Sequence, residues 1–448
     1  MYRGYNPTPD EAEFMTFEQS RQLQQKSHAL IPGGAHTYAK GDDQFPQLAP
    51  AFIERGRGCH VWDVDGNPFI EYGSGLRAIT LGHAHPRVVE AAQKQMELGA
   101  NFTRPSHLEV ECAQAMIDMV GGEMVKFAKH GSDAVTAAVK LSRALTGRPL
   151  VAVCGDQPFF AVDDWFIGST PMHSGIPDAT RALTLKFRYN DLDSLTALLE
   201  QHKNLIACVI MEAETTDEPK PGYLQSVIDL CHRHGTVFVL DEMISGFRWH
   251  NAGAAGFYNI EPDLRTFGKA MGNGFSISAL VGKRDIMKLG GLQHDQQRVF
   301  LMSTTHGGET HCLAAAIETM RLYRELDVVS RLWKQGERLK RGVLDAVKRQ
   351  GVEKFFGVLG RPCNLLYYTL DPQGQRSQFY RALFLQELIR RGVLAPSFVV
   401  NYAHSDVDID KTIDAVEGAL VVYRKAIDEG VEKYLVGPPV KPVFRTHN

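Results

Sequence analysis

The sequence lacks several features that would place it in a specialised class of protein. Its longest apolar runs, such as residues 206–211 (IACVIM), are far shorter than a bilayer span, and its N-terminus lacks the basic-then-apolar order of a signal peptide. The seven cysteines are scattered without a CxxC pair, so neither a disulfide framework nor a zinc site is expected. The net charge of −3 is too small to favour nucleic acid or a membrane as partner. We expect a cytoplasmic enzyme without a metal ion.

Strand and helix patterns alternate through the middle of the chain. Apolar strands are expected at residues 150–154, 205–212 and 236–242, and helices at residues 132–147, 191–202 and 224–235. Short, continuous apolar strands separated by helices are typical of a parallel sheet covered on both faces. In the first of these helices, Ser132 is the expected N-cap and Gly147 the expected end.

These patterns predict an α/β protein with three parts. Residues 1–79 form an N-terminal segment, with a helix from residue 8 to residue 30 and a hairpin at Asp65–Gly66. Residues 80–325 form a large domain with a mostly parallel sheet. Residues 326–448 form a smaller α+β domain, with long amphipathic helices at 328–349 and 408–429 around short strands such as residues 363–370.

Polar residues stand at the ends of the expected strands, where open parallel sheets bind their ligands. Glu212 and Asp241 each close an apolar strand, and a carboxylate placed there needs a cationic or donor partner. Gly131 and Ser132 begin a helix, whose free N–H groups favour a phosphate. Ser132 could equally be a simple N-cap, and Asp241 a cap for the next helix.

Lys269 lies in an unusual setting, the run RTFGKAMGNGF at residues 265–275, among glycines and apolar side chains. A desolvated lysine has a lowered pKa and becomes an amine nucleophile suited to Schiff bases. A phosphate-binding helix end, a strand-end aspartate and such a lysine together meet the needs of pyridoxal 5′-phosphate (PLP). The three features therefore predict a PLP-binding domain.

With these residues in view, the chain resembles the class III, fold type I, PLP-dependent aminotransferases, and within them the glutamate-1-semialdehyde 2,1-aminomutase branch. The pairing of DEMISGFR (241–248) with FGKAMGNG (267–274) is the most specific part of the resemblance. Further matching segments are IPGG (31–34), WDVDGN (62–67), GHAHP (82–86), TGR (146–148), YNDL (189–192), PDL (262–264) and LAPS (394–397). The resemblance covers nearly the whole chain and implies the fold type I architecture, a large PLP-binding domain with a smaller α+β domain.

The resemblance also implies catalytic roles for two residues. Lys269 is expected to hold the cofactor as a Schiff base and to move the substrate proton, and Asp241 to pair with the ring nitrogen. Met243 is expected to pack under the ring, and Gly131 and Ser132 to hold the phosphate.

Further cofactor contacts follow from the same resemblance. Glu212 is expected near the ring hydroxyl, and Phe159, or else Phe160, to stack on the ring. Thr304 matches a threonine that reaches the phosphate of the neighbouring subunit, which implies a homodimer with shared active sites.

The chain departs from the family pattern around the substrate. The aminomutase arginine after PGG is missing from PGGAHTYAKGDDQ (32–44), where Lys40 lies nearest that place. Lysine does not reproduce the bidentate fork of arginine. Lys40, Arg77 and His306 are therefore the candidate substrate contacts, or else they are surface or interface charges. The pair His83 and His85 is read as part of a turn and not as a metal site.

Three functions remain open from the sequence. The first is an aminotransferase that moves an amino group from a donor to a carbonyl acceptor, such as a keto sugar, through Lys269 and pyridoxamine phosphate. The second is an aminomutase that moves the amino group within one molecule, against which the missing arginine argues. The third is a PLP-binding dimer without turnover, against which Lys269 and Asp241 argue.

Overall fold

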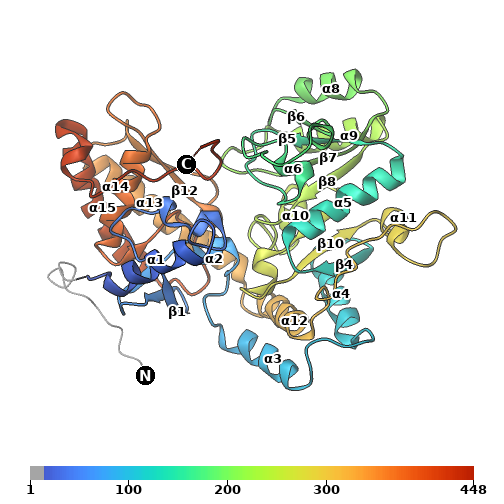
Figure 1. Cartoon of the computed structure of the whole chain (residues 1–448), viewed down its shortest axis with the longest axis horizontal. Coiled ribbons are helices and arrows are strands. Elements are labelled where there is room, and N and C mark those ends of the chain that lie inside the picture. The colour runs from blue at the N-terminus through green and yellow to red at the C-terminus, as the bar shows by residue number, and fades with distance from the viewer. Residues whose placement is uncertain (1–14, 448) are drawn as a thin grey trace. The chain divides into compact units, whose positions relative to one another are not determined.

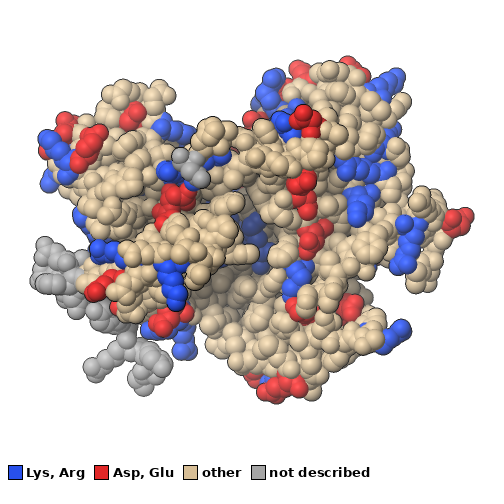
Figure 2. All heavy atoms as spheres, viewed as in Figure 1, with Lys and Arg blue, Asp and Glu red and all other residues tan. Residues whose placement is uncertain are grey.

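The computed structural model describes residues 15–447, which divide into two compact units (Figure 1). Of these residues, the first unit comprises 15–75, 80–85 and 330–443, and the second comprises 76–79, 86–329 and 444–447. Basic and acidic side chains are scattered over both units on the face drawn in Figure 2, as expected for a small net charge. Among the described residues, no helix is long and apolar enough to span a bilayer.

The second unit is built on a seven-stranded sheet with the order β4-β10-β9-β8-β7-β5-β6. Its strands are β4 (Met124–Ala128), β5 (Leu150–Cys154), β6 (Thr184–Phe187), β7 (Ile206–Glu212), β8 (Val237–Asp241), β9 (Leu264–Phe267) and β10 (Ser278–Gly282). Strands β6, β5, β7, β8 and β9 run parallel, and β10 runs antiparallel to both of its neighbours, β9 and β4. The prediction of a mostly parallel sheet is therefore confirmed.

Helices cover both faces of this sheet because its strands are apolar on both sides. Val239 of β8 belongs to the core cluster that includes α5 (Gly131–Thr146), whereas its neighbours Phe238 and Leu240 belong to the opposite cluster with α8 (Leu192–Gln201) and α9 (Tyr223–Arg233). The same alternation occurs along β5 and β7. The unit also contains α3 (Pro86–Glu97), α4 (His107–Val120), α6 (Asp164–Ile167), α7 (Asp178–Arg181), α10 (Gly253–Tyr258), α11 (Arg284–Met287) and α12 (Thr310–Glu325).

The first unit contains two smaller sheets and long helices. One sheet has the order β1-β2-β3-β13, and the other pairs β11 with β12. The elements are α1 (Glu18–Leu30), β1 (Ile53–Arg57), β2 (His60–Asp63), β3 (Pro68–Glu71), β11 (Phe356–Leu359), β12 (Leu366–Thr369), α14 (Gln378–Ile389), β13 (Val393–Leu394) and α15 (Asp406–Glu429), with α13 (Val328–Arg349) beginning at the boundary. Strands β2 and β3 form the hairpin predicted around Asp65–Gly66.

Three local predictions differ from the structure. The first helix begins at Glu18, and the part of the prediction that falls on residues 8–14 lies outside the described residues. Residues 362–364 form a 3₁₀ turn, so the strand expected from residue 363 begins only at Leu366. The N-cap of α5 is His130, whose backbone N–H donates to the Asp133 carboxylate at 3.0 Å, and Ser132 lies inside the first turn. The interpretation of Ser132 as a cap is therefore wrong.

Candidate active site

Two carboxylates lie side by side at the carboxyl ends of neighbouring strands. Glu212 of β7 pairs in register with Asp241 of β8, which in turn pairs with Thr266 of β9. The Asp241 Oδ1 atom accepts hydrogen bonds from the Met243 backbone N–H at 2.8 Å and from the Thr266 hydroxyl at 3.2 Å. Both hydrogen bonds to this carboxylate that involve described residues use Oδ1, so Oδ2 is left to bind a ligand. Burial raises the pKa of Asp241, and the nearby Lys269 opposes that rise.

Lys269 follows β9 after one residue, Gly268, and its charge interacts with both carboxylates. It begins a 3₁₀ turn (Lys269–Gly272), and its backbone has a φ of +41°, a conformation that L-residues adopt at a cost. Burial lowers the pKa of its ammonium, whereas the charges of Asp241 and Glu212 raise it. The side chain is therefore a desolvated amine whose charge two carboxylates balance, as the sequence predicted for Lys269.

Arg77 completes the charged cluster. Burial lowers its pKa, and the Glu212 carboxylate raises it, which places the guanidinium in the field of Glu212. Arg77 also has a left-handed backbone, with φ +70°, and its carbonyl accepts from the buried Arg248 guanidinium. Burial, followed by the charge of Asp241, raises the pKa of Glu212 to about 8. Arg77 is half-buried, and its charge lowers the pKa of both Glu212 and Lys269.

Met243 lies against two glycine positions that border the cluster. A Cβ on Gly131 would meet the Met243 sulfur at 2.8 Å, and a Cβ on Gly268 would meet the same sulfur at 2.8 Å. Gly131 begins α5, and Gly268 precedes Lys269. The Met243 thioether therefore packs between the N-terminus of α5 and the turn that begins at Lys269. A side chain at Gly131 or Gly268 would clash with the Met243 sulfur.

The N-terminus of α5 follows the carboxyl end of β4 and offers an anion-binding site at the same edge of the sheet. Gly131 and Ser132 form its first turn, where backbone N–H groups lack intrahelical partners and the helix dipole favours negative charge. The buried Ser132 Oγ accepts from the Val162 backbone N–H at 3.0 Å, which leaves its proton free to donate. This arrangement fits a phosphate group held by Gly131 and Ser132.

The two candidate stacking rings lie in different environments. Phe160 is 2% exposed and packs in the core cluster that contains Met243, whereas Phe159 is 42% exposed. The Phe159 ring makes an edge contact with Phe166, with centroids 5.7 Å apart, and a tilted contact with Phe444. Of the two, only Phe159 presents a free face, so it remains the stronger candidate for stacking.

Three residues with supporting roles were missed by the sequence analysis. Gln157 clamps the end of β7, since its amide donates to the Glu212 carbonyl at 2.7 Å and accepts from the Glu212 N–H at 2.8 Å. Thr266 orients Asp241, and Arg248 braces the backbone at Arg77. A signal existed for Thr266 alone, as a polar residue near the end of the strand that leads to Lys269. The partners of Gln157 and Arg248 are distant in sequence.

Three further residues were predicted to contact the substrate or the cofactor: Thr304, His306 and Lys40. Within the described part of the second unit, the structure does not place Thr304 or His306 in contact with Lys269. Thr304 is exposed and lines a cavity of about 570 Å³ together with residues 101–106 and 125–127, whose lining does not include Lys269 or Asp241. The His306 ring is hydrogen-bonded to Glu309 at 2.8 Å. Lys40 belongs to the first unit, where it is exposed in a 3₁₀ turn (Tyr38–Lys40). The roles assigned to these three residues stay predictions.

The cluster fits one cofactor in particular. A helix N-terminus suits a phosphate, Asp241 Oδ2 suits a protonated ring nitrogen, and the desolvated Lys269 amine suits an aldehyde. The fold and these three groups define a PLP-dependent enzyme of fold type I.

Comparison with known proteins identifies the family. The sequence model of the family "Aminotransferase class-III" matches residues 38–361, so the chain belongs to the class III aminotransferases. It is 31% identical to a glutamate-1-semialdehyde 2,1-aminomutase of Syntrophobacter fumaroxidans, over 91% of this chain and 98% of that protein. It is 32% identical to the enzyme of the same name in Chloroflexus aggregans, over 88% and 95% of the two chains.

Solved structures agree with this assignment. The FumI protein of Sphingopyxis sp. MTA144, in its PLP internal aldimine form, superposes with a TM-score of 0.84 at 26% identity, covering 92% of this chain and 98% of that one. A glutamate-1-semialdehyde aminomutase of Pseudomonas aeruginosa PAO1 has the same fold, with a TM-score of 0.79 at 21% identity over 91% and 95% of the chains. The cofactor of the enzyme is therefore PLP, as the sequence predicted.

Proposed function

We propose that the enzyme is an aminotransferase that moves an amino group from a carboxylated amino donor to a separate, polar carbonyl acceptor, of which a keto sugar is one candidate. The observation that supports a carboxylated donor is the interaction of the Arg77 charge with Glu212 and Lys269. A guanidinium inside the cluster is the group best suited to a donor carboxylate.

The residues of the cluster have distinct roles in this reaction. When bound, PLP supplies an electron sink for the negative charge that develops when the substrate carbon loses its proton. Lys269 would hold the cofactor through its amine and would move the proton at the substrate carbon. Its desolvated amine is suited to this task, because a lowered pKa favours the free base. Asp241 keeps the proton on the ring nitrogen through Oδ2, held in place by Thr266 and Met243.

Glu212 adapts the cluster to substrate binding. Without substrate, burial and the Asp241 charge favour the protonated form of Glu212, whereas Lys269 and Arg77 favour its carboxylate. A substrate carboxylate that reaches Arg77 shifts Glu212 further toward the protonated form, so that Glu212 does not remain an unpaired buried anion. The cluster therefore accepts an anionic donor without gathering uncompensated negative charge.

The second candidate function is an aminomutase acting on glutamate-1-semialdehyde, which the names and identities of the relatives favour. Both functions use Lys269 and Asp241 in the same way. They differ in the destination of the amino group. An aminomutase places it on another carbon of the same molecule, whereas an aminotransferase passes it to a second molecule.

A donor scan separates the two functions. The purified holoenzyme is mixed with single amino acids and the release of the matching keto acid is measured, with and without carbonyl acceptors. Keto acid release that converts the cofactor to its amine form supports the aminotransferase. Turnover of glutamate-1-semialdehyde with no second substrate supports the aminomutase instead. A protein that binds PLP through Lys269 but turns over neither substrate would be a non-catalytic PLP-binding protein.

The role of Arg77 has its own test. Arg77→Gln is expected to raise KM for carboxylated donors about 10- to 150-fold, because a charge-assisted hydrogen bond contributes about 1.5–3 kcal/mol. Activity toward amine donors without a carboxylate should change little. Arg188→Gln is the control, since Arg188 pairs with Asp191 at an exposed site. An equal loss for both donor types would assign Arg77 a structural role.

We also propose a homodimer in which Thr304 of each subunit reaches the phosphate of its partner. The exposure of Thr304, and a cavity lining that excludes Lys269, support a role in trans. Mixing Lys269→Ala with Thr304→Val subunits tests it, because one site of each mixed dimer would then have both residues intact. Recovery of normal PLP affinity at that site is expected. No recovery would place Thr304 in its own subunit's site.

A further inference from the structure

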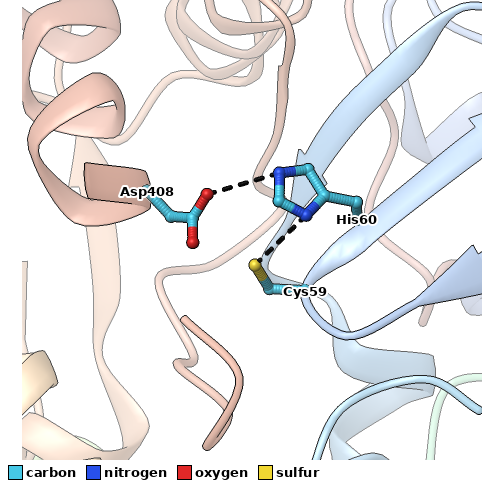
Figure 3. Close-up of side chains that lie close together, drawn as sticks. All are labelled: Cys59, His60 and Asp408. Carbon is cyan, nitrogen blue, oxygen red and sulfur yellow. Dashed lines mark hydrogen bonds and ion pairs between the residues drawn. The ribbon is translucent and has the colours of Figure 1, made fainter. Parts of the chain in front are cut away.

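Three metal-ligating side chains meet in the first unit, whereas the residues proposed for PLP belong to the second. Figure 3 shows the His60 ring between Cys59 and Asp408, with Nδ1 3.5 Å from the Cys59 Sγ atom and Nε2 3.3 Å from the Asp408 Oδ1 atom. One ligand atom from each residue lies within 4.8 Å of the others. In a tetrahedral zinc site, bonds of ~2.0–2.3 Å separate the ligand atoms by about 3.3–3.8 Å. The Cys59 Sγ and His60 Nδ1 atoms already have this spacing. Asp408 faces the other ring nitrogen, so a shared ion requires the His60 ring or the Asp408 carboxylate to turn.

The fold fixes the position of each ligand. Arg57 pairs with His60, so Gly58 and Cys59 form the two-residue turn between β1 and β2, with a φ of +60° at Gly58. Asp408 lies in the first turn of α15, where its Oδ2 atom accepts from the Ser405 N–H at 2.9 Å and from the Ser405 hydroxyl at 2.6 Å. The Ser405 contacts orient the carboxylate and leave Oδ1 directed at His60, as outer partners do for metal ligands.

We propose that Cys59, His60 and Asp408 bind a divalent transition-metal ion of the zinc type, which ties the β1–β2 hairpin to the start of α15. Sulfur, imidazole nitrogen and carboxylate oxygen are the three donor types that Zn²⁺ accepts. A thiolate and a carboxylate together balance its charge. Cys59 is 2% exposed, whereas the His60 side chain is 39% exposed, so a water molecule can reach the fourth position.

Binding at this site must release a proton. The thiolate and not the thiol is the metal ligand, so the metal has to displace the proton from the Cys59 sulfur. Cys59 is also almost fully buried, which makes it a poor nucleophile and argues against a Cys-His-Asp catalytic triad. The arrangement therefore suits a structural metal ion better than covalent chemistry.

A second group of potential ligands does not support the same inference. Glu309, His311 and Cys312 also lie close together. The Lys129 ammonium, however, donates to both Glu309 and Cys312, and an ammonium among the ligands opposes a cation there. Among the described residues, the polar side-chain contacts of Cys59 and His60 are with each other and with Asp408, and no ammonium is among them, so the Cys59 site is the better candidate.

The test uses the holoenzyme, freed of metal by a chelator and then titrated with ZnCl₂ alone. Calorimetry is expected to show one zinc ion bound per chain, with release of a proton that varies with buffer ionisation. Zinc-edge X-ray absorption should show one sulfur neighbour, and zinc should raise the melting temperature of the enzyme. A site with nitrogen and oxygen neighbours only would overturn the proposal and show adventitious binding.

Matched variants locate the ion. Cys59→Ser should lose the sulfur neighbour, and both Cys59→Ser and His60→Gln should lose the zinc-dependent rise in melting temperature. His28→Gln is the control, because His28 faces Asp42 at 2.7 Å in the same unit without a cysteine. Retained PLP absorbance shows that each variant is folded. Unchanged zinc binding in Cys59→Ser, or an equal loss in His28→Gln, would refute the site.

Discussion

The contact of Met243 with two glycines gives the most specific prediction, because the expected effect is a steric clash alone. Neither Gly131 nor Gly268 has a left-handed backbone, so alanine is acceptable at both positions on conformational grounds. In Gly131→Ala, the new methyl would lie 2.8 Å from the Met243 sulfur, 3.3 Å from its Cε and 3.5 Å from its Cγ. The sulfur must therefore move by a few tenths of an ångström or more to reach an ordinary contact.

The movement available to Met243 is limited, which sets the magnitude. Its backbone N–H is bonded to Asp241, and its sulfur also lies 2.8 Å from the Cβ position of Gly268. Overpacking of this kind costs about 1–3 kcal/mol, which corresponds to a loss of PLP affinity of about 5- to 150-fold if the strain falls on the site. Gly268→Ala, which would meet only the sulfur at short range, should cost less than Gly131→Ala.

A double-mutant cycle measures the effect. PLP affinity is determined for the apoenzyme of Gly131→Ala, Met243→Val and the double variant, with the melting temperature as a folding check. Valine lacks the sulfur, so the double variant should recover most of the lost affinity, with a coupling of about 1–2 kcal/mol. Gly155→Ala is the control, since its methyl would meet no atom closer than 3.4 Å. Additive losses would mean that the methyl meets the cofactor and not Met243.

The remaining predictions concern charged groups of the second unit. Lys269→Ala should abolish turnover and the borohydride-stable link to PLP, as read by mass spectrometry, while a PLP affinity like that of wild type would contradict its role. The pKa of Glu212, raised to about 8 from 4.5, means that the folded protein binds more protons than the unfolded chain between these values. Apoenzyme stability should therefore fall as pH rises through this window, and Glu212→Gln should flatten the denaturation profile; an unchanged slope would refute the shift. Glu242, fully buried, accepts from the Ser245 hydroxyl and from the N–H groups of Ala254 and Ala255, so Glu242→Gln should destabilise the protein by about 2–5 kcal/mol in urea unfolding. A cost below 1 kcal/mol would show that the amide finds equivalent partners.

Much of the sheet could be predicted because local sequence decides it. Strand β5 and helix α13 have the predicted bounds, and β7, β8, α8 and α9 differ from prediction by one or two residues at their ends. The apolar runs and the positions of Gly and Asn at their ends suffice for this. The cap of α5 was misplaced because Ser132 is a common capping residue, whereas the capping interaction comes from Asp133 and the His130 backbone.

The sequence by itself determined the fold class, the cofactor and the order of the main groups along the chain. A carboxylate at a strand end and a lysine among glycines are local features, and their chemistry follows from residue type. Only the tertiary structure placed Arg77 beside Glu212, Gln157 against the end of β7, and Met243 between Gly131 and Gly268. It also brought Asp408 to Cys59 and His60 from the far end of the chain. Such meetings depend on strand order and side-chain packing across the fold, which hydrophobic periodicity does not encode.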